Sequence, residues 1–467
     1  MLKKRWRKIL AASLVVGTLT FAPEIYDVEN FSVVQAEVKL YTAMGVDYGN
    51  EIESQEIVKL RARDKAIKNA VKQAGVYLKT YSRSVNSELT DDEITAITSN
   101  AYELVGEPKY NRVIKQVSDQ ITLIVWEVTV DVNVDDAEIK NWRKRDSTER
   151  SKLINQTRDA NEAAADNERK VEDLRKRANN ITDEAERAQL KTEFDQADNE
   201  FLFNQKVEAG NKATYKGDFD AAEKFYTEAI ELNPNNSEVY VSRGMLYSSN
   251  IIGIKYVNMF KNKSRGNSAK TYYELALADL NKAIELNPSN ADNYALRGFT
   301  HSSFKKHQLA LNDFARALQI NPNCLIAYTF RSFHYSIIMK DNKLALADLN
   351  KAIELHPDNP AGYSMRALIY KAEEKYDLAL DDFSKAIELE PHSPHHYSSR
   401  GDVYRELKMY YKAIDDYTKY IELQTAEDPE DILLSWGYYH RGECYEAIGE
   451  TAKAQADKKK YEELEKK

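Results

Sequence analysis

Six arginines stand in the middle of tyrosine-rich, apolar stretches: YVSRGMLY, YALRGFTH, YTFRSFHY, YSMRALIY, YSSRGDVY and YYHRGECY. A guanidinium in such a place can bind an acidic ligand through two parallel hydrogen bonds, or it can pair with a carboxylate of the same protein. An aspartate follows each arginine along the chain. The resulting pairs are Arg243 with Asp279, Arg297 with Asp313, Arg331 with Asp348, Arg366 with Asp382, Arg400 with Asp416, and Arg441 with Asp457.

The two residue types occur together, which favours structural ion pairs. The related stretch that begins at Phe203 has Ala209 and Phe225 at the two places and so lacks both charges. An unpaired buried guanidinium would cost several kcal/mol, and a carboxylate on a partner helix removes that cost. Pairing between neighbouring units would leave Arg243 facing Phe225, so we expect each pair to form within one unit. A row of arginines that binds an acidic ligand is the alternative.

Other motifs that could carry chemistry are weak. The string PHSPHH places His392, His395 and His396 in one loop, but a metal site needs three or four converging ligands and no acidic residue stands nearby at helical spacing. Gly-rich phosphate loops, His-Glu-x-x-His and paired Cys-x-x-Cys motifs are missing. We therefore expect no enzyme, no metal and no cofactor. Cys324 and Cys444 are expected to be separate buried side chains.

A repeat of about 34 residues organises the second half of the chain. Prolines follow the strings AIEL, AIEL, ALQI, AIEL and AIEL at spacings of 54, 34, 35 and 34 residues, at Pro234, Pro288, Pro322, Pro357 and Pro391. Each unit contains two amphipathic helices, and one such unit cannot bury its own apolar face. The pattern predicts a solenoid. The first interval contains about 20 extra residues, 248–270, which we expect to lengthen two packed helices.

This repeat resembles the tetratricopeptide repeat (TPR), from residue 203 to about residue 460. The family's small and aromatic positions are represented in one unit by Tyr294, Gly298, Ala310, Phe314, Ala317 and Pro322. The resemblance implies about seven helical hairpins. The last helix, TAKAQADKKKYEELEKK, carries charged residues where earlier units are apolar and is predicted to cap the array.

In proteins with this repeat the first helices usually line a concave groove that binds another protein or a peptide. Transferred to this chain, the groove would hold apolar and aromatic anchors bordered by charge. An alternative is that several of these side chains only pack on the neighbouring unit. The predicted groove residues are Phe299, Phe333, Leu368, Lys371, Asp402, Arg405, Trp436 and Tyr439.

Residues 37–135 have a different character and predict a small α+β module with the order β-α-α-β-β. The stretch RARDKAIKNAVKQAGVYL, residues 61–78, resembles the N-terminal domain of flagellar assembly protein T and of related exported envelope lipoproteins. That resemblance implies an extracytoplasmic assembly or binding module without catalysis. It depends on Ala62, Ala66, Ala70, Gln73, Ala74 and Gly75.

Residues 136–200 are polar and charged, with Asn179-Asn180 as a turn between two helical runs. The irregular apolar spacing predicts a polar helical spacer, and partial disorder is the alternative.

The first 36 residues are interpreted as a secretory signal peptide. A basic start is followed by the apolar run Ile9 to Ala22 and by Val34-Gln35-Ala36, a small-x-small cleavage site. Fourteen apolar residues span about 21 Å, which is short of the ~30 Å hydrocarbon core of a membrane. We expect cleavage after Ala36 and an exported protein that is periplasmic, on the cell surface or secreted.

The formal net charge is -9, which argues against nucleic acid or an anionic membrane as the main partner. The sequence therefore predicts a mainly α protein with a small α+β domain, a helical spacer and a TPR solenoid at 201–467. Its predicted function is that of an exported scaffold that binds another protein during assembly or organisation of the cell envelope. The alternatives are an envelope hydrolase or a small-molecule binder with its site in the α+β domain.

Overall fold

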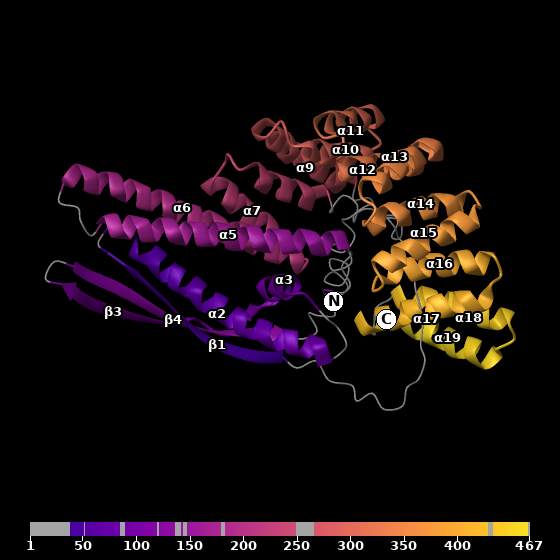
Figure 1. The fold of residues 1–467 in the computed structure, drawn as a ribbon, viewed down its shortest axis with the longest axis horizontal. Coiled ribbons are helices and arrows are strands. Elements are labelled where there is room, and N and C mark those ends of the chain that lie inside the picture. The colour runs from indigo at the N-terminus through magenta and orange to yellow at the C-terminus, as the bar shows by residue number, and fades with distance from the viewer. Residues whose placement is uncertain are drawn as a thin grey trace. The chain divides into compact units, whose positions relative to one another are not determined.

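The computed structural model describes residues 38–50, 52–84, 89–118, 121–135, 142, 147–178, 183–248, 266–427 and 433–465. The predicted signal peptide and residues 249–265 of the predicted insert lie outside these. The chain divides into two compact units, one of Val34–Trp142 and Glu149–Leu246 (unit 1) and one that is mainly Tyr247–Lys467 (unit 2). The fold is mainly helical with one small sheet (Figure 1). None of the described helices has the length and apolar character that crossing a membrane requires.

Unit 1 begins with the α+β module, whose elements follow the expected order with one short strand added. They are β1 (Val38–Gly49), α2 (Gln55–Ser84), α3 (Asp91–Ala101), β2 (Glu103–Leu104), β3 (Lys109–Ser118) and β4 (Ile121–Asp135). The long strand β4 pairs in antiparallel register with β1 along one side and with β3 and β2 along the other. The sheet is therefore built around β4.

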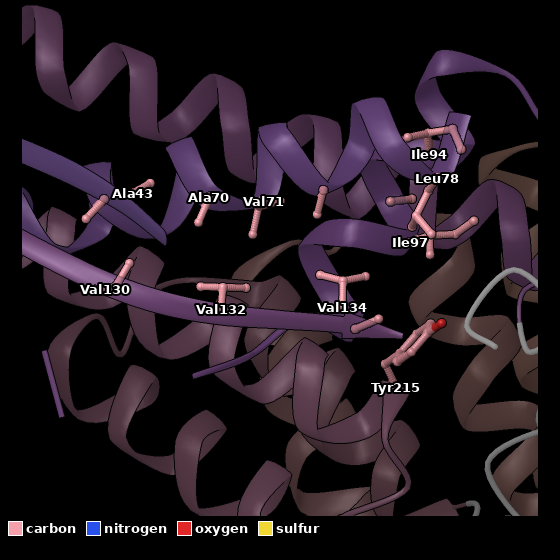
Figure 2. Packing of buried hydrophobic residues seen from close by; sticks show 14 of the residues in the cluster. Ala43, Ala70, Val71, Leu78, Ile94, Ile97, Val130, Val132, Val134 and Tyr215 are labelled. Atoms are coloured by element: carbon pink, nitrogen blue, oxygen red, sulfur yellow. The ribbon is translucent and has the colours of Figure 1, made fainter. Parts of the chain in front are cut away.

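Helix α2 covers one face of this sheet because small residues let it approach closely. Ala62, Ala66, Ala70 and Ala74 recur once per turn and are fully buried. A side chain at Gly45 of β1 would come within 2.2 Å of the α2 backbone, so only glycine fits there. Alternate residues of β4, including Val130, Val132 and Val134, complete the core from below the helix, as Figure 2 shows.

The predicted polar spacer is a pair of long helices, α5 (Ser147–Ala178) and α6 (Glu184–Tyr215), that is docked on the module. Arg175 of α5 donates to Asp47 of β1 at 3.2 Å and to Glu53 at 2.8 Å, and all three side chains are buried. Arg61 of α2 donates to Asp198 of α6 at 2.6 Å. Such buried, hydrogen-bonded pairs fix orientation, because breaking any one leaves a charge without compensation.

The boundary expected at residue 200 falls inside α6, which differs from the prediction. This helix runs on without glycine or proline near residue 200 and then forms a hairpin with α7 (Phe219–Leu232), the first hairpin of the repeat type. Its last residue, Tyr215, packs in the core of the α+β module (Figure 2). One helix is thus both spacer and repeat, and the first hairpin belongs to unit 1. Residues 237–248 continue as a helix.

Unit 2 starts with α9 (Gly266–Leu286) and continues as antiparallel hairpins that stack in chain order (Figure 1). Each hairpin has a first and a second helix. They are α10 (Ala291–Ser303) with α11 (His307–Ile320), α12 (Leu325–Phe333) and η1 (His334–Met339) with α13 (Asn342–Leu355), α14 (Pro360–Ala372) with α15 (Tyr376–Leu389), α16 (Pro394–Glu406) with α17 (Tyr410–Glu427), and α18 (Leu433–Ala447) with α19 (Thr451–Glu465).

Local chemistry explains where these helices begin and end. Within a hairpin the first helix ends in a left-handed residue, and the following amide donates back to the helix, as Lys306 does to His301 at 3.0 Å. Between hairpins the proline of the repeat stops the second helix. A tyrosine of the next helix then donates to the carbonyl of that proline, as Tyr363 does to Pro357 at 3.1 Å.

Candidate functional site

The five arginine and aspartate pairs of unit 2 form within single hairpins. In each pair Nε and Nη2 of the arginine on the first helix donate to the two carboxylate oxygens of the aspartate on the second helix, at 2.6 to 2.9 Å. The pairs are Arg297 with Asp313, Arg331 with Asp348, Arg366 with Asp382, Arg400 with Asp416, and Arg441 with Asp457. The aspartates are buried, so these arginines have their acidic ligand inside the protein.

Each arginine except Arg331 also binds the preceding repeat, a contact that sequence reasoning missed. Its Nη1 donates to a polar side chain on the second helix of that repeat, two residues after the aspartate there. The contacts are Arg297 to Asn281 at 2.7 Å, Arg366 to Asn350 at 2.7 Å, Arg400 to Ser384 at 3.0 Å, and Arg441 to Thr418 at 3.1 Å. Ala315 takes this position before Arg331. The sequence does carry a signal for this contact, a recurring string of Asp, an apolar or aromatic residue, and then Asn, Ser or Thr on the second helices.

The protonation equilibria of these pairs reflect burial as well as hydrogen bonding. The hydrogen bond to Asp313 raises the pKa of Arg297, against a smaller lowering by burial. In the most deeply buried pair burial dominates, and it lowers the pKa of Arg441 and raises the pKa of Asp457. The guanidinium groups of Arg331, Arg366 and Arg400 each lie about 6 Å from two tyrosine rings, and that of Arg297 lies about 6 Å from one.

The first predicted pair, Arg243 with Asp279, spans the two units and stays a prediction. Within unit 1, Arg243 donates to Thr227 of α7 at 2.8 Å. Thr227 occupies the same repeat position as Asn281 and its equivalents. The contact to the preceding second helix is therefore already present at the first hairpin.

The apolar residues predicted for the groove lie on first helices and are half-buried. Phe299 of α10 stacks on Phe330 with ring centroids 4.5 Å apart, and it lies 6.1 Å from Phe333. Phe333 also packs on a core cluster that its own hairpin and the next one share, made of Ala345, Leu349, Met365 and Ile369. Leu368 of α14 packs on the core around Phe383. Each of the three side chains thus packs partly on a neighbouring helix and is partly exposed on the surface.

The charged residues predicted for the groove meet in one network on α14, α16 and α18. Lys371 donates to Asp402 at 2.9 Å, and Asp402 also accepts from the hydroxyl of Tyr417 at 2.8 Å. Arg405 donates to the same hydroxyl at 3.1 Å and to Glu443 at 3.1 Å. The network joins the first helices of three successive hairpins, and each member holds the next in place.

An aromatic cluster adjoins this network at the C-terminal end. The rings of Trp436 and His440 have centroids 3.9 Å apart, and His440 shares Glu443 with Arg405 at 2.7 Å. Burial, with Arg405 nearby, lowers the pKa of His440, so the imidazole is neutral near pH 7. Tyr439 is 45% exposed and lies beside His440, with ring centroids 5.0 Å apart. We call Lys371, Asp402, Arg405, Trp436, Tyr439, His440 and Glu443 the C-terminal cluster.

The histidines of the PHSPHH string do not converge. His396 is buried, with Nδ1 3.0 Å from the hydroxyl of Ser364 and Nε2 3.2 Å from Glu390. This Ser-His-Glu series resembles a catalytic triad in composition, but all three side chains are buried between hairpins and it ties α14 to α16. Over the described ranges, no three His, Cys, Asp or Glu side chains gather as metal ligands would. Cys324 and Cys444 are buried free thiols, and burial raises the pKa of each to about 12.

A shallow hollow of about 390 Å³ lies beside β1 and α2 in the α+β module. It is lined by Ala43, Met44, Asn69, Lys72, Gln73 and Val76. Lysine is the one titratable side chain in this lining, whereas hydrolysis of wall polymers needs two carboxyl groups. The buried carboxylates of the module, Asp47 and Glu53, are held by Arg175. The hollow therefore offers nothing specific to a hydrolase.

Comparisons with known proteins show that the chain contains tetratricopeptide repeats. Models of this repeat match residues 360–393, 225–270, and both 213–236 and 397–427. The first and last of these ranges cover the hairpin α14–α15 and most of α16–α17. The predicted TPR solenoid is therefore confirmed, whereas the predicted likeness to flagellar assembly protein T stays a prediction. Proteins built from this repeat are generally scaffolds for protein interaction, and nothing in the repeat indicates catalysis.

Solved structures with related repeats cover roughly half of the chain. MamA is 25% identical, with 39% of this chain and 94% of that chain covered and a TM-score of 0.29. A TPR protein of Parabacteroides merdae ATCC 43184 is 21% identical, with 56% and 93% covered and a TM-score of 0.37. YrrB, described as having an unusual peptide-binding site, is 24% identical, with 45% and 95% covered and a TM-score of 0.29. No curated protein matches significantly.

Proposed function

We propose that this protein is an exported scaffold that binds another protein or peptide on the first helices of its repeats, in assembly or organisation of the cell envelope. The observation that supports this most is the C-terminal cluster. Its charged members are held in place by one another, and Tyr439 beside them is exposed. Rigid aromatic side chains bordered by fixed charges are typical of the residues that dominate protein interfaces.

The physical state of the cluster suits recognition better than catalysis. Asp402 is buried and accepts from two donors, so it is a poor base or nucleophile. Arg405 and Glu443 neutralise each other and remain partly exposed. A partner would therefore meet a surface whose side chains lose little conformational freedom on binding.

Export is the second part of the proposal, and it rests on the sequence of residues 1–36. It predicts a mature chain that starts at Glu37 and is found in the envelope or culture fluid after expression in the native cell. Sequencing of the mature N-terminus tests this. A chain that keeps its first 36 residues and stays in the cytoplasm would contradict export without affecting the binding surface.

The binding surface is tested with the variant Tyr439→Ala and the control Tyr110→Ala. Both tyrosines are more than 40% exposed, and Tyr110 lies in β3 of unit 1. Wild-type chain and both variants are used to capture proteins from the native envelope fraction, and the captured proteins are quantified by mass spectrometry. We expect at least one protein to be captured equally by wild type and Tyr110→Ala, and about 30-fold less by Tyr439→Ala, which corresponds to a hot-spot loss of about 2 kcal/mol. Capture that is insensitive to Tyr439 would contradict the proposal.

A further inference from the structure

The turns inside the hairpins of unit 2 form a continuous edge, which we call the turn edge: residues 305–309, 337–344, 373–378 and 406–412. Contacts between successive turns place them side by side. Glu373 is hydrogen-bonded to Asn342, and Tyr376 is hydrogen-bonded to Glu406. The ring of His307 in the first turn lies 5.3 Å from that of His334, three residues before the second turn. The edge therefore runs through four repeats.

Large apolar side chains gather on the turn edge although it faces solvent. In the described part of unit 2 nearly all exposed large apolar residues lie there, the exceptions being Leu275 and Tyr439. Those on the edge are between 37% and 73% exposed: Leu309, Ile337, Met339, Leu344, Leu378, Leu407, Met409 and Tyr411. A concentration of exposed apolar side chains of this kind is typical of an interaction surface.

Lysines without acidic partners stand among these apolar residues. Over the described residues no carboxylate lies within ion-pair distance of Lys305, Lys306, Lys340, Lys343 or Lys408. By contrast, the lysine three residues after the aspartate on four of the second helices pairs with a glutamate one turn later. These lysines are Lys282, Lys351, Lys385 and Lys419. The edge also carries Lys375 and Lys412, and five acids at positions 341, 373, 374, 377 and 406. The edge is thus positive overall in a chain of net charge -9.

Three of the lysines occupy a backbone position that physically favours glycine. The second residue before each second helix is left-handed, and it is Gly217 at the first hairpin and Gly449 at the last. At the four hairpins between, the same position holds Lys305, Lys340, Glu374 and Lys408, with φ from 55° to 62°. A non-glycine residue in this left-handed conformation costs about 1 to 2 kcal/mol. The charged residues therefore occupy this position although glycine would be more stable there.

We propose that the turn edge docks on an anionic lipid surface. Lysines attract the headgroups, and the shallow, spread-out leucine, isoleucine and methionine side chains enter the boundary between headgroups and acyl chains. A lipid surface fits better than an acidic protein because the apolar residues form a line along four turns, while a protein anchor would require a pocket. This proposal differs from the expectation, based on net charge, that an anionic membrane is not the main partner.

The experiment uses residues 37–467, which contain every described residue and lack the apolar run 9–22. Vesicles of phosphatidylcholine with 30% phosphatidylglycerol are compared with pure phosphatidylcholine vesicles by flotation at 0.1 M salt. We expect wild type to bind the anionic vesicles only. Because a lysine near an anionic surface contributes about five-fold in binding, about 1 kcal/mol, the triple variant Lys305→Gly, Lys340→Gly and Lys408→Gly should bind about 100-fold more weakly.

The glycine substitutions separate binding from folding. They relieve backbone strain, so the Tm of the triple variant should equal or exceed that of wild type. Glu374→Gly relieves the same strain and removes a negative charge, so it should bind the anionic vesicles at least as well as wild type. Lys351→Gln removes a paired lysine away from the edge and should leave vesicle binding unchanged.

Two results would overturn the proposal. One is equal binding of wild type and the triple glycine variant to anionic vesicles. The other is failure of wild type to bind anionic vesicles. If wild type then captured an acidic protein, and the triple glycine variant did not, the turn edge would be assigned to a protein partner instead.

Discussion

At the scale of single residues, the five arginine–aspartate pairs of unit 2 form an ion-pair ladder, in which four of the arginines each connect three helices and Arg331 connects two. Arg366 donates to both oxygens of Asp382 and to Asn350 of the preceding repeat, so it fixes the hairpin and its neighbour at once. Sequence reasoning found the first connection because Arg and Asp vary together. It missed the contact with the preceding repeat because the residue two positions after each aspartate varies among Asn, Ser and Thr, which have only their polarity in common.

We expect Arg366→Met to lower the free energy of opening of α14 and α15 by about 2 to 4 kcal/mol, because it leaves Asp382 buried without its cation. Adding Asp382→Leu should restore most of that loss, since an apolar pair of similar volume needs no compensation. Native-state hydrogen exchange of the two helices measures both changes. An unchanged exchange rate in Arg366→Met would show that the ladder contributes no stability.

Arg331 supplies the matched comparison, because Ala315 leaves it without the contact to the preceding repeat. Arg331→Met should therefore affect its own hairpin, α12 to α13, while protection of α11 stays close to that of wild type. If both variants disturbed the preceding second helix equally, the third hydrogen bond of Arg366 would be energetically irrelevant.

At the scale of elements, the π-helical turn η1 absorbs an extra residue in the hairpin formed by α12, η1 and α13. Arg331 and Asp348 are 17 residues apart, whereas the other pairs within unit 2 are 16 apart. A wider turn holds the added residue and leaves the ion pair at 2.7 Å. The 35-residue spacing of Pro322 and Pro357 signals the insertion, but periodicity alone does not locate it.

His334 opens η1 and should make this hairpin sensitive to acid. Its side chain is fully buried, with Nδ1 2.7 Å from the hydroxyl of Ser302, and Nε2 has no hydrogen-bond partner in the described part of the chain. Burial, together with His307, lowers the pKa of His334 to about 4. The unfolded chain, with a pKa near 6.5, takes up the proton first, so stability is complete above pH 6.5 and falls as the pH drops toward 4.

The loss should amount to about 2 to 3 kcal/mol for this group. His334→Gln keeps a polar partner for Ser302 and does not titrate, so its Tm should fall less than that of wild type between pH 7 and pH 4.5. Thermal unfolding at several pH values measures the difference. Parallel Tm curves for the two proteins would show that His334 does not take up a proton on unfolding.

At the scale of the whole molecule, the sequence predicts repeats better than boundaries. Periodic prolines and small residues such as Gly298 specify the hairpins, because a side chain at Gly298 would meet Phe314 at 2.8 Å. The join between spacer and array could not be placed, because α6 has no break and its two ends serve different cores. The C-terminal cluster was predicted as separate groove residues, and Glu443 and His440 of α18 were missed because they come close to Arg405 of α16 only after the hairpins stack.

The same nearest-neighbour stacking makes a final prediction about cooperativity. A chain that ends after residue 427 lacks α18 and α19 and exposes Tyr417, Tyr420 and Ile421, all buried in the intact protein. Because each hairpin is stabilised mainly by its neighbours, hydrogen-exchange protection should fall most in α16 and α17 and progressively less toward α10. Unit 1 has its own core around α2 and β4 and should keep its protection. An equal loss in α2 and in α17 would mean that the chain unfolds as one cooperative body, and the description as two units joined along a repeat array would then be wrong.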